Sequence, residues 1–184
     1  MTPALLHDPV IDLAVRLGLA VLLGTAAFHK ARDLGAFRDT LRDYDLLPQW
    51  TIAPMAPVVI ALELSIAGSL AAIPHGVAGP LGAIVLLAVY SAAIGINLAR
   101  GRREIDCGCL GPALRQPLSE WLLVRNGVVI LGALVVIVPT SPRPLTWVDV
   151  LSLAGAVTTL SLIWISTNRL TATWRQLGRA RLAR

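Results

Sequence analysis

The chain has 184 residues, of which 55% are hydrophobic and 15% are charged, and its formal net charge is +5. Soluble domains usually carry about 25% charged residues, whereas the apolar residues here fall into runs of about twenty. This composition excludes a soluble enzyme domain, a disordered tail and a secreted disulfide scaffold, for which two cysteines are too few. We predict an integral membrane protein.

Five apolar stretches are long enough to cross a membrane, because a helix needs roughly 20 apolar residues to span the hydrocarbon core. The expected transmembrane helices are 10–31, 51–73, 77–99, 121–138 and 147–166. Helices are favoured over barrel strands because the runs are continuous rather than alternating. The predicted fold class is therefore all-α: one membrane domain over 1–184, a bundle of about five transmembrane helices followed by a basic cytoplasmic tail at 167–184.

The basic residues are divided unequally between the two ends of these helices. Thirteen Lys and Arg residues lie at or beyond the ends of the first, third and fifth stretches, against Arg143 alone at the opposite end. The thirteen are Lys30, Arg32, Arg38, Arg42, Arg100, Arg102, Arg103, Arg115, Arg169, Arg175, Arg179, Arg181 and Arg184. Since this bias sets topology, we expect the N-terminus outside and the C-terminus in the cytoplasm of a bacterial-type inner (plasma) membrane. The bias, with attraction to anionic lipid, explains the net charge without a nucleic-acid partner.

The two cysteines are separated by one residue, as Cys107-Gly108-Cys109, in the segment between the third and fourth stretches. Gly108 has no side chain, so the backbone can bend to bring the two sulfurs together. The favoured interpretation is a redox pair that cycles between dithiol and disulfide. Inert structural thiols and half of a metal site remain alternatives, although zinc takes four ligands or three and a water. We predict no metal site within one chain.

Three ionisable side chains inside or at the edge of the apolar stretches are further candidates, because such groups are costly in lipid and usually face the bundle interior. Glu63 lies near the middle of the second stretch, Lys30 at the end of the first and Arg125 near the start of the fourth. We expect them to form a polar pocket beneath the cysteine segment. The alternative is that Glu63 has a basic or hydroxyl partner and only fixes helix register. Asp12 and Arg16, four residues apart, can form an ion pair.

Other chemical motifs are absent from the sequence. There is no phosphate-binding glycine loop, dinucleotide fingerprint, zinc-protease helix or serine-hydrolase elbow. Tyr90 and Asn97 in the third stretch fit ordinary hydrogen bonding between helices and a catalytic role equally well.

Several short motifs spread over residues 10–138 carry a family resemblance. They are His29-Lys30-Ala31-Arg32-Asp33, Phe37, Tyr44-Asp45-Leu46-Leu47-Pro48, Glu63-Leu64 with Gly68, Cys107-Gly108-Cys109-Leu110-Gly111, and Arg125-Asn126. On these motifs the sequence resembles the MauE family of methylamine-utilisation membrane proteins, which belongs with the broader DoxX-like four-helix membrane bundles. Leu110 stands where the family usually has Phe, a conservative difference that leaves the thiols unaffected.

The resemblance implies a DoxX-like four-helix core plus one further helix, and a role in maturation of methylamine dehydrogenase. It implies help in processing, export or disulfide formation of that enzyme's small subunit, beside a thioredoxin-like partner protein. It assigns the redox role to Cys107 and Cys109 as catalytic residues and, less directly, a supporting role to Lys30, Glu63 and Arg125. We therefore expect a thiol–disulfide redox component that serves an exported client protein. Whether the chain is itself an enzyme is left open, and no cofactor is expected, with a quinone as the one alternative.

The expected orientation conflicts with this function, because disulfides form outside the cytoplasm whereas the charge rule places the thiols inside. Alternating exposure of the pair, a quinone or partner, or the opposite topology would each remove the conflict. A second class of function is a non-catalytic membrane chaperone or small-molecule-binding bundle, in which Glu63 with Lys30 or Arg125 lines the site. A metal carrier or sensor is a third.

Overall fold

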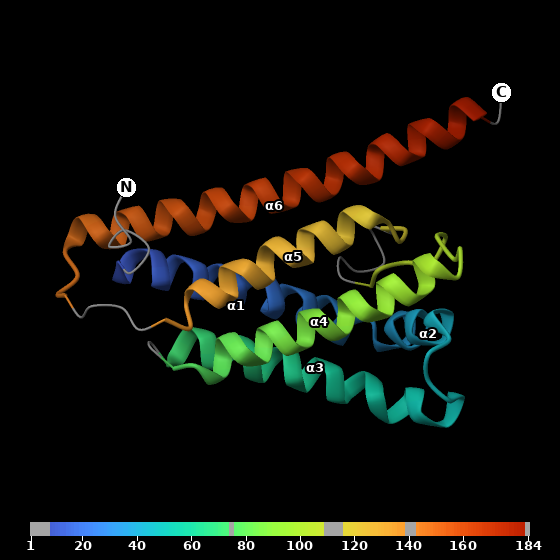
Figure 1. Ribbon diagram of the computed structural model, residues 1–184, viewed down its shortest axis with the longest axis horizontal. Helices are drawn as coiled ribbons and strands as arrows, with labels where there is room; N and C mark the ends of the chain where they lie inside the picture. Colours follow the sequence, from blue (N-terminus) through green and yellow to red (C-terminus); the bar gives the residue numbers. More distant parts are fainter. Residues whose placement is uncertain (1–7, 74–75, 109–115, 139–142, 183–184) are drawn as a thin grey trace.

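The computed structural model describes residues 8–73, 76–108, 116–138 and 143–182, and side chains as far as Thr167 and at Leu170. Within these ranges the only regular elements are six α-helices and one isolated β-bridge, between Asp106 and Pro117. The helices, shown in Figure 1, are α1 (Pro9–Arg32), α2 (Leu34–Tyr44), α3 (Gln49–Ala72), α4 (Ala78–Ala99), α5 (Glu120–Val135) and α6 (Trp147–Leu182). The prediction of an all-α bundle is confirmed.

Five of the helices coincide with the five apolar stretches. Among the described residues, α1, α3, α4 and the Trp147–Thr167 part of α6 are long and apolar enough to cross a membrane. Helix α5 has 16 residues and ends at Val135, before the end at 138 that hydropathy predicts. Helix α6 continues past the expected end of its span as far as Leu182. The basic tail therefore begins as a direct extension of the last helix.

Helix α2 is absent from the sequence prediction. It begins because Asp33 interrupts α1 and its carboxylate accepts the N–H of Ala36 at 2.9 Å, which caps the new helix. Phe37 then packs against Ala56 and Ile60 of α3. Because α2 has only 11 residues, it is stabilised by this tertiary contact rather than by its own length.

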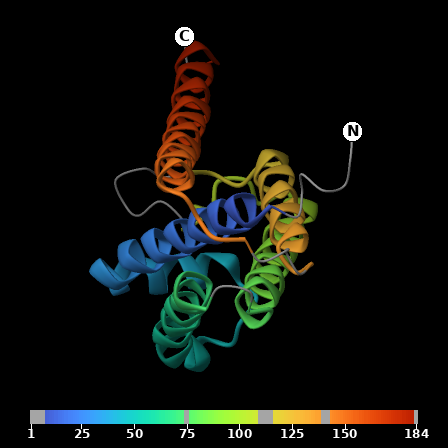
Figure 2. The ribbon, with the colours of Figure 1, turned by 90° about the vertical axis from the view of Figure 1, so that its left-hand side faces the viewer.

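Helix α1 lies at the centre of the bundle. It packs against α3 and α6 and also contacts α5 and α2, while α3–α4 and α4–α5 contacts complete the arrangement, as Figures 1 and 2 show. The main core cluster joins four helices and consists of Leu19, Leu23, Ala67, Leu70, Ala83, Leu86 and Ala133. Small residues in this cluster allow the helices to approach closely.

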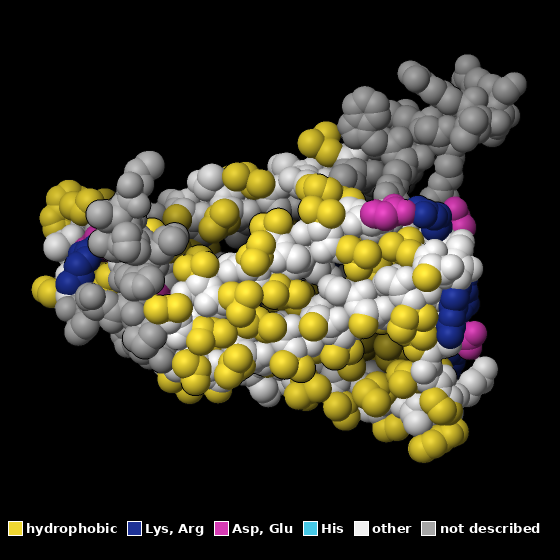
Figure 3. Space-filling model, viewed as in Figure 1, with side chains coloured by type: hydrophobic (Ala, Val, Ile, Leu, Met, Phe, Trp, Pro, Cys, Tyr) yellow, Lys and Arg dark blue, Asp and Glu magenta, His cyan; other side chains and the backbone are white. Residues whose placement is uncertain are grey.

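The outer surface of the bundle is apolar along its middle. Figure 3 shows hydrophobic side chains over the central part of one face and charged side chains at its two ends. Val85, Val128 and Leu131 are each about two-thirds exposed, and no residue in the apolar window of α6 is buried. Lipid tails are the solvent that such a surface requires. The chain is a multi-pass membrane protein.

Arg16 connects three segments at the end of the bundle where the chain begins. Its side chain is 2% exposed. Nε donates to Asp12 Oδ2 at 2.8 Å, Nη1 to the carbonyl of Gly76 at 2.7 Å, and Nη2 to the carbonyl of Val136 at 2.7 Å. The expected Asp12–Arg16 pair is confirmed, and the same guanidinium ties α1 to the α3–α4 link and to the end of α5.

A second charged contact lies outside the membrane-spanning segments at the same end. Arg143 pairs with Asp8 at 3.2 Å and with Asp149 at 2.8 Å, which connects the start of α1 to the start of α6. The pKa of Asp8 is held below its ordinary value because its carboxylate caps the Val10 N–H and also accepts a hydrogen bond from Arg143. The carboxylates of Asp149 and Asp8 raise the pKa of Arg143.

The Arg16→Ala variant tests the first of these contacts. It leaves the Asp12 carboxylate buried without its cation, so we expect the free energy of unfolding to fall by about 3–5 kcal/mol. The measurement is unfolding in mixed detergent micelles followed by circular dichroism. As a control, the double variant Asp12→Leu/Arg16→Met removes both charges and should be less destabilised than Arg16→Ala. A single variant as stable as the parent chain would contradict the assignment.

Candidate functional site

The cysteine segment leaves α4 and returns to α5 through a short antiparallel pairing. The N–H of Cys107 donates to the carbonyl of Gln116 at 2.8 Å, and the N–H of Leu118 donates to the carbonyl of Ile105 at 3.1 Å. Cys109 falls within 109–115, outside the described residues. The structure therefore places the first cysteine of the predicted catalytic pair, and the pairing of Cys107 with Cys109 stays a prediction.

Cys107 lies in an apolar cluster between α4 and α5. The side chains around it are those of Ile94, Leu118 and Leu122, and Cys107 itself is 9% exposed. Its sulfur is therefore shielded from bulk water by the loop base and by two helices.

The turn after Cys107 is fixed by close contact with α2. Gly108 has φ 74°, in the left-handed region that glycine adopts without strain. A Cβ at this position would lie 3.0 Å from Cγ2 of Thr40. Glycine is thus required at this position for two independent reasons, its backbone conformation and the space left by Thr40.

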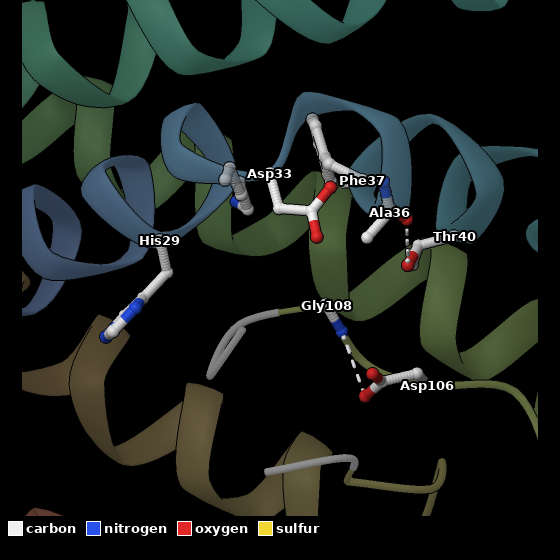
Figure 4. A pocket seen from close by; sticks show the side chains of 8 residues that line it. His29, Asp33, Ala36, Phe37, Thr40, Asp106 and Gly108 are labelled. Carbon is white, nitrogen blue, oxygen red and sulfur yellow. Dashed lines mark hydrogen bonds between the residues drawn. The ribbon is translucent and has the colours of Figure 1, made fainter. Parts of the chain in front are cut away.

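A partly open cavity of about 30 Å³ lies beside this turn, large enough to hold water. Its lining consists of His29, Lys30, Asp33, Ala36, Phe37, Thr40, Asp106 and Gly108. In Figure 4, Asp33 and Thr40 from the α1–α2 region face the loop that carries Asp106 and Gly108. The cavity therefore lies between the end of the first span and the cysteine segment.

Lys30 connects this cavity to a buried polar network. Lys30 is 5% exposed and Glu63 is completely buried. Nζ of Lys30 donates to Glu63 Oε1 and, at 3.2 Å, to the hydroxyl of Tyr90, which itself donates to Glu63 Oε1 at 2.7 Å. The ammonium also lies over the rings of Phe37 and Tyr90, at 5.1 and 4.9 Å from their centroids. Such contacts compensate a charge in low dielectric.

Arg125 belongs to a different network, at the base of the cysteine loop. Its Nη1 donates to Gln116 Oε1 at 3.3 Å, and its guanidinium lies 4.7 Å from the ring centroid of Trp164 on α6. Its neighbour Asn126 donates to Ser91 of α4 at 3.2 Å. The structure thus joins Lys30 and Glu63 of the predicted pocket and places Arg125 among other partners. Neither Glu63 nor Arg125 lines the cavity, and a functional role of the three residues stays a prediction.

An exposed ion pair between Arg103 and Glu120 lies at the base of the cysteine loop. Arg103 donates to Glu120 through both terminal nitrogens, at 3.1 and 2.5 Å. This hydrogen-bonded contact raises the pKa of Arg103. It joins the start of the loop to the first turn of α5.

The expectation that Tyr90 hydrogen-bonds between helices is confirmed, whereas Thr40 was not among the predicted site residues. Tyr90 is the hydroxyl partner of the buried acid, a role that its position in an apolar stretch does not reveal. Thr40 acts through α2, a helix that hydropathy does not predict. Among the described residues, no group of three or more His, Cys, Asp or Glu side chains is arranged to hold a metal ion.

Comparison with known proteins identifies a family. The sequence model described as "Methylamine utilisation protein MauE" matches residues 8–139. The chain is 36% identical over 170 residues to the methylamine utilization protein MauE of Paracoccus denitrificans, covering 90% of this chain and 89% of that protein. It is 39% identical over 167 residues to the MauE protein of Methylorubrum extorquens, covering 89% of each. No solved structure matches the chain.

The Lys30–Glu63 pair gives a prediction about stability. Glu63→Ala leaves the Lys30 ammonium buried without its carboxylate, so we expect the free energy of unfolding to fall by about 3–5 kcal/mol. Tyr90→Phe removes one hydroxyl and should cost about 1 kcal/mol. The control is Lys30→Met/Glu63→Leu, in which both charges are gone and stability should lie closer to that of the parent chain. Chemical denaturation in detergent measures all three, and a double variant less stable than Glu63→Ala would refute the ion-pair account.

Proposed function

The chain belongs to the MauE family of methylamine utilisation proteins, and we propose that it acts there as a thiol–disulfide redox component. It serves methylamine utilisation by assisting the maturation of an exported client enzyme. Cys107 and Cys109 are the reacting residues, and a thioredoxin-like protein is the exchange partner. The reaction is a transfer of two electrons between dithiols and disulfides.

The observation that carries this proposal is the way the cysteine segment is held. The backbone hydrogen bonds from Cys107 to Gln116 and from Leu118 to Ile105 fix the base of the loop. Gly108 lies against Thr40, beside a cavity lined by both basic and acidic side chains. A loop whose base is anchored beside a partly open cavity supports exchange with a partner that approaches from the same end of the bundle.

The electrons and protons of this exchange balance between the chain and its partner, without a bound cofactor. One thiolate of the chain attacks the disulfide of the thioredoxin-like partner, which forms a mixed disulfide and releases one partner thiolate. The second cysteine then attacks the mixed disulfide and releases the second partner thiolate. The chain's pair loses two electrons and two protons, the partner gains both, and the reverse sequence restores the dithiol.

We infer that the N-terminus lies outside and that the cysteine loop and the C-terminus share the cytoplasmic side of a bacterial-type inner membrane. The support is the gathering of basic residues at the loop end of the bundle, since Lys and Arg are retained on the cytoplasmic side. Exchange with a cytoplasmic protein follows directly from this orientation. Contact with an exported client would require a carrier of electrons across the membrane, for which a quinone or a second protein is a candidate.

A second function is favoured by one observation. Oε2 of the fully buried Glu63 has no hydrogen-bond partner among the described residues, although Oε1 has two. A buried carboxylate oxygen normally accepts a hydrogen bond. A bundle that binds a small polar molecule or a client segment at this carboxylate, without redox chemistry, is therefore the alternative.

Substitution of the cysteines separates these functions. Cys107→Ser and Cys109→Ser should each reduce growth on methylamine to the level of a deletion strain, because either loss removes the two-electron cycle. Glu63→Gln is the matched comparison, and it should be milder if the thiols act and more severe if Glu63 binds a molecule. Immunoblots of membranes verify equal amounts of each variant. Full complementation by both serine variants would exclude the redox function.

Labelling of the thiols tests the orientation. A membrane-impermeant maleimide added to intact cells should leave the cysteines unlabelled, whereas the same reagent should label them in inverted vesicles after reduction. Because Cys107 is shielded, a denatured sample provides the reference for complete labelling. Labelling from the outside of intact cells would reverse the inferred topology.

A further inference from the structure

Trp164 connects helix α6 to α5 through a contact between an aromatic ring and a buried cation. The guanidinium of Arg125 lies 4.7 Å from the centroid of the Trp164 ring, and Arg125 is 7% exposed. An aromatic face is a favourable neighbour for a cation that is shielded from water. Helix α6 packs mainly against α1, and no residue in its apolar window is buried. The Trp164 ring therefore gives α6 a specific contact with the start of α5.

Arg125 extends this contact to the base of the cysteine loop. Its Nη1 donates to Oε1 of Gln116 at 3.3 Å, and Gln116 is 4% exposed. The backbone carbonyl of Gln116 accepts the N–H of Cys107 at 2.8 Å. A continuous series of contacts thus runs from Trp164 through Arg125 and Gln116 to Cys107, and all four residues lie in the described part of the chain.

The ring of Trp164 favours one of two positions that the Arg125 side chain can take. Arg125 lies near the start of α5, at the end of the bundle where basic residues gather. A long arginine side chain at such a place can extend to the water at the membrane surface. In that extended position it would leave Gln116, and a buried amide oxygen that loses its donor is costly. Contact with the ring stabilises the inward position, in which the guanidinium supports Gln116.

We propose that Trp164 is a positioning residue: its ring keeps Arg125 directed towards Gln116, which holds the base of the cysteine loop and keeps Cys107 shielded. Helix α6 thereby controls how far the sulfur of Cys107 is exposed. A thiol must be accessible to react, so loss of the ring accelerates the reactions of Cys107. The exposure of Cys107 is a property of the fold, whereas its consequence for thiol exchange rests on the proposed redox function.

The test measures how fast a membrane-impermeant maleimide alkylates Cys107 in the folded, full-length protein in detergent. Every sample carries Cys109→Ser, so that Cys107 is the single thiol of the chain. Trp164→Ala removes the ring, whereas Trp164→Phe retains an aromatic face. The matched control is Trp147→Ala, which removes an exposed ring at the start of the same helix. Circular dichroism verifies the fold, and labelling in denaturant defines complete reaction.

We expect alkylation to be about fivefold faster in Trp164→Ala, a change that loss of a shielded contact between a cation and an aromatic ring can produce. Trp164→Phe should stay within about twofold of the parent rate, because a phenyl ring also attracts a cation. Trp147→Ala should leave the rate unchanged. An unchanged rate in Trp164→Ala, or an equal increase in Trp164→Phe, would overturn the inference.

A double variant tests the route through Gln116. Gln116→Met removes the acceptor of the Arg125 hydrogen bond and should accelerate alkylation about as much as Trp164→Ala. If both side chains act through the same series of contacts, Trp164→Ala/Gln116→Met reacts no faster than the faster single variant. Independent effects would multiply instead, and that result would refute the route.

The outcomes also separate this inference from the proposed function. If growth on methylamine requires both cysteines but Trp164→Ala does not change the alkylation rate, the positioning role is wrong and the redox function stands. If Trp164→Ala accelerates alkylation while both serine variants support full growth, the positioning role stands and the redox function fails.

Discussion

The ion pair between Lys30 and Glu63 is the constraint on which the middle of the bundle depends. A carboxylate and an ammonium placed in the apolar interior of a membrane bundle are each costly, and the cost is offset only when they meet with good geometry. Tyr90 completes the contact, so α1, α3 and α4 share one register and cannot slide past each other without exposing a charge. The same register places Lys30 in the wall of the cavity beside Gly108, which links the stability of the bundle to the setting of the cysteine loop.

The described part of the loop has contacts with α2 and α5. Thr40 of α2 limits the space at Gly108, the Arg103–Glu120 pair ties the loop base to α5, and Gln116 contacts Arg125. Cys107 lies in an apolar cluster at this base, and the cavity borders Gly108, the residue that follows it. The described sulfur is therefore covered, while the turn that follows it borders a partly open cavity.

Much of the fold follows from the sequence because lipid requires long apolar runs, and five such runs mark five of the six helices. Helix α2 could not be predicted in this way, since its stability comes from the contact of Phe37 with α3. The pairing of Lys30 with Glu63 could be predicted, because an unpaired charge within the membrane is costly and such groups usually pair with each other. Arg125 is equally costly, yet its partners depend on the rotation of α5 about its axis, which hydropathy does not determine.

Helix α6 is longer than a membrane span requires. Its 36 residues form an unbroken rod about 54 Å long at 1.5 Å per residue, whereas the hydrocarbon layer is about 30 Å thick. Figure 1 shows its distal part running beyond the remaining helices. A straight helix transmits rotation and displacement along its axis far better than a coil of equal length. The part of α6 that follows its apolar window therefore reaches past the lipid layer as a continuation of the span that packs against α1.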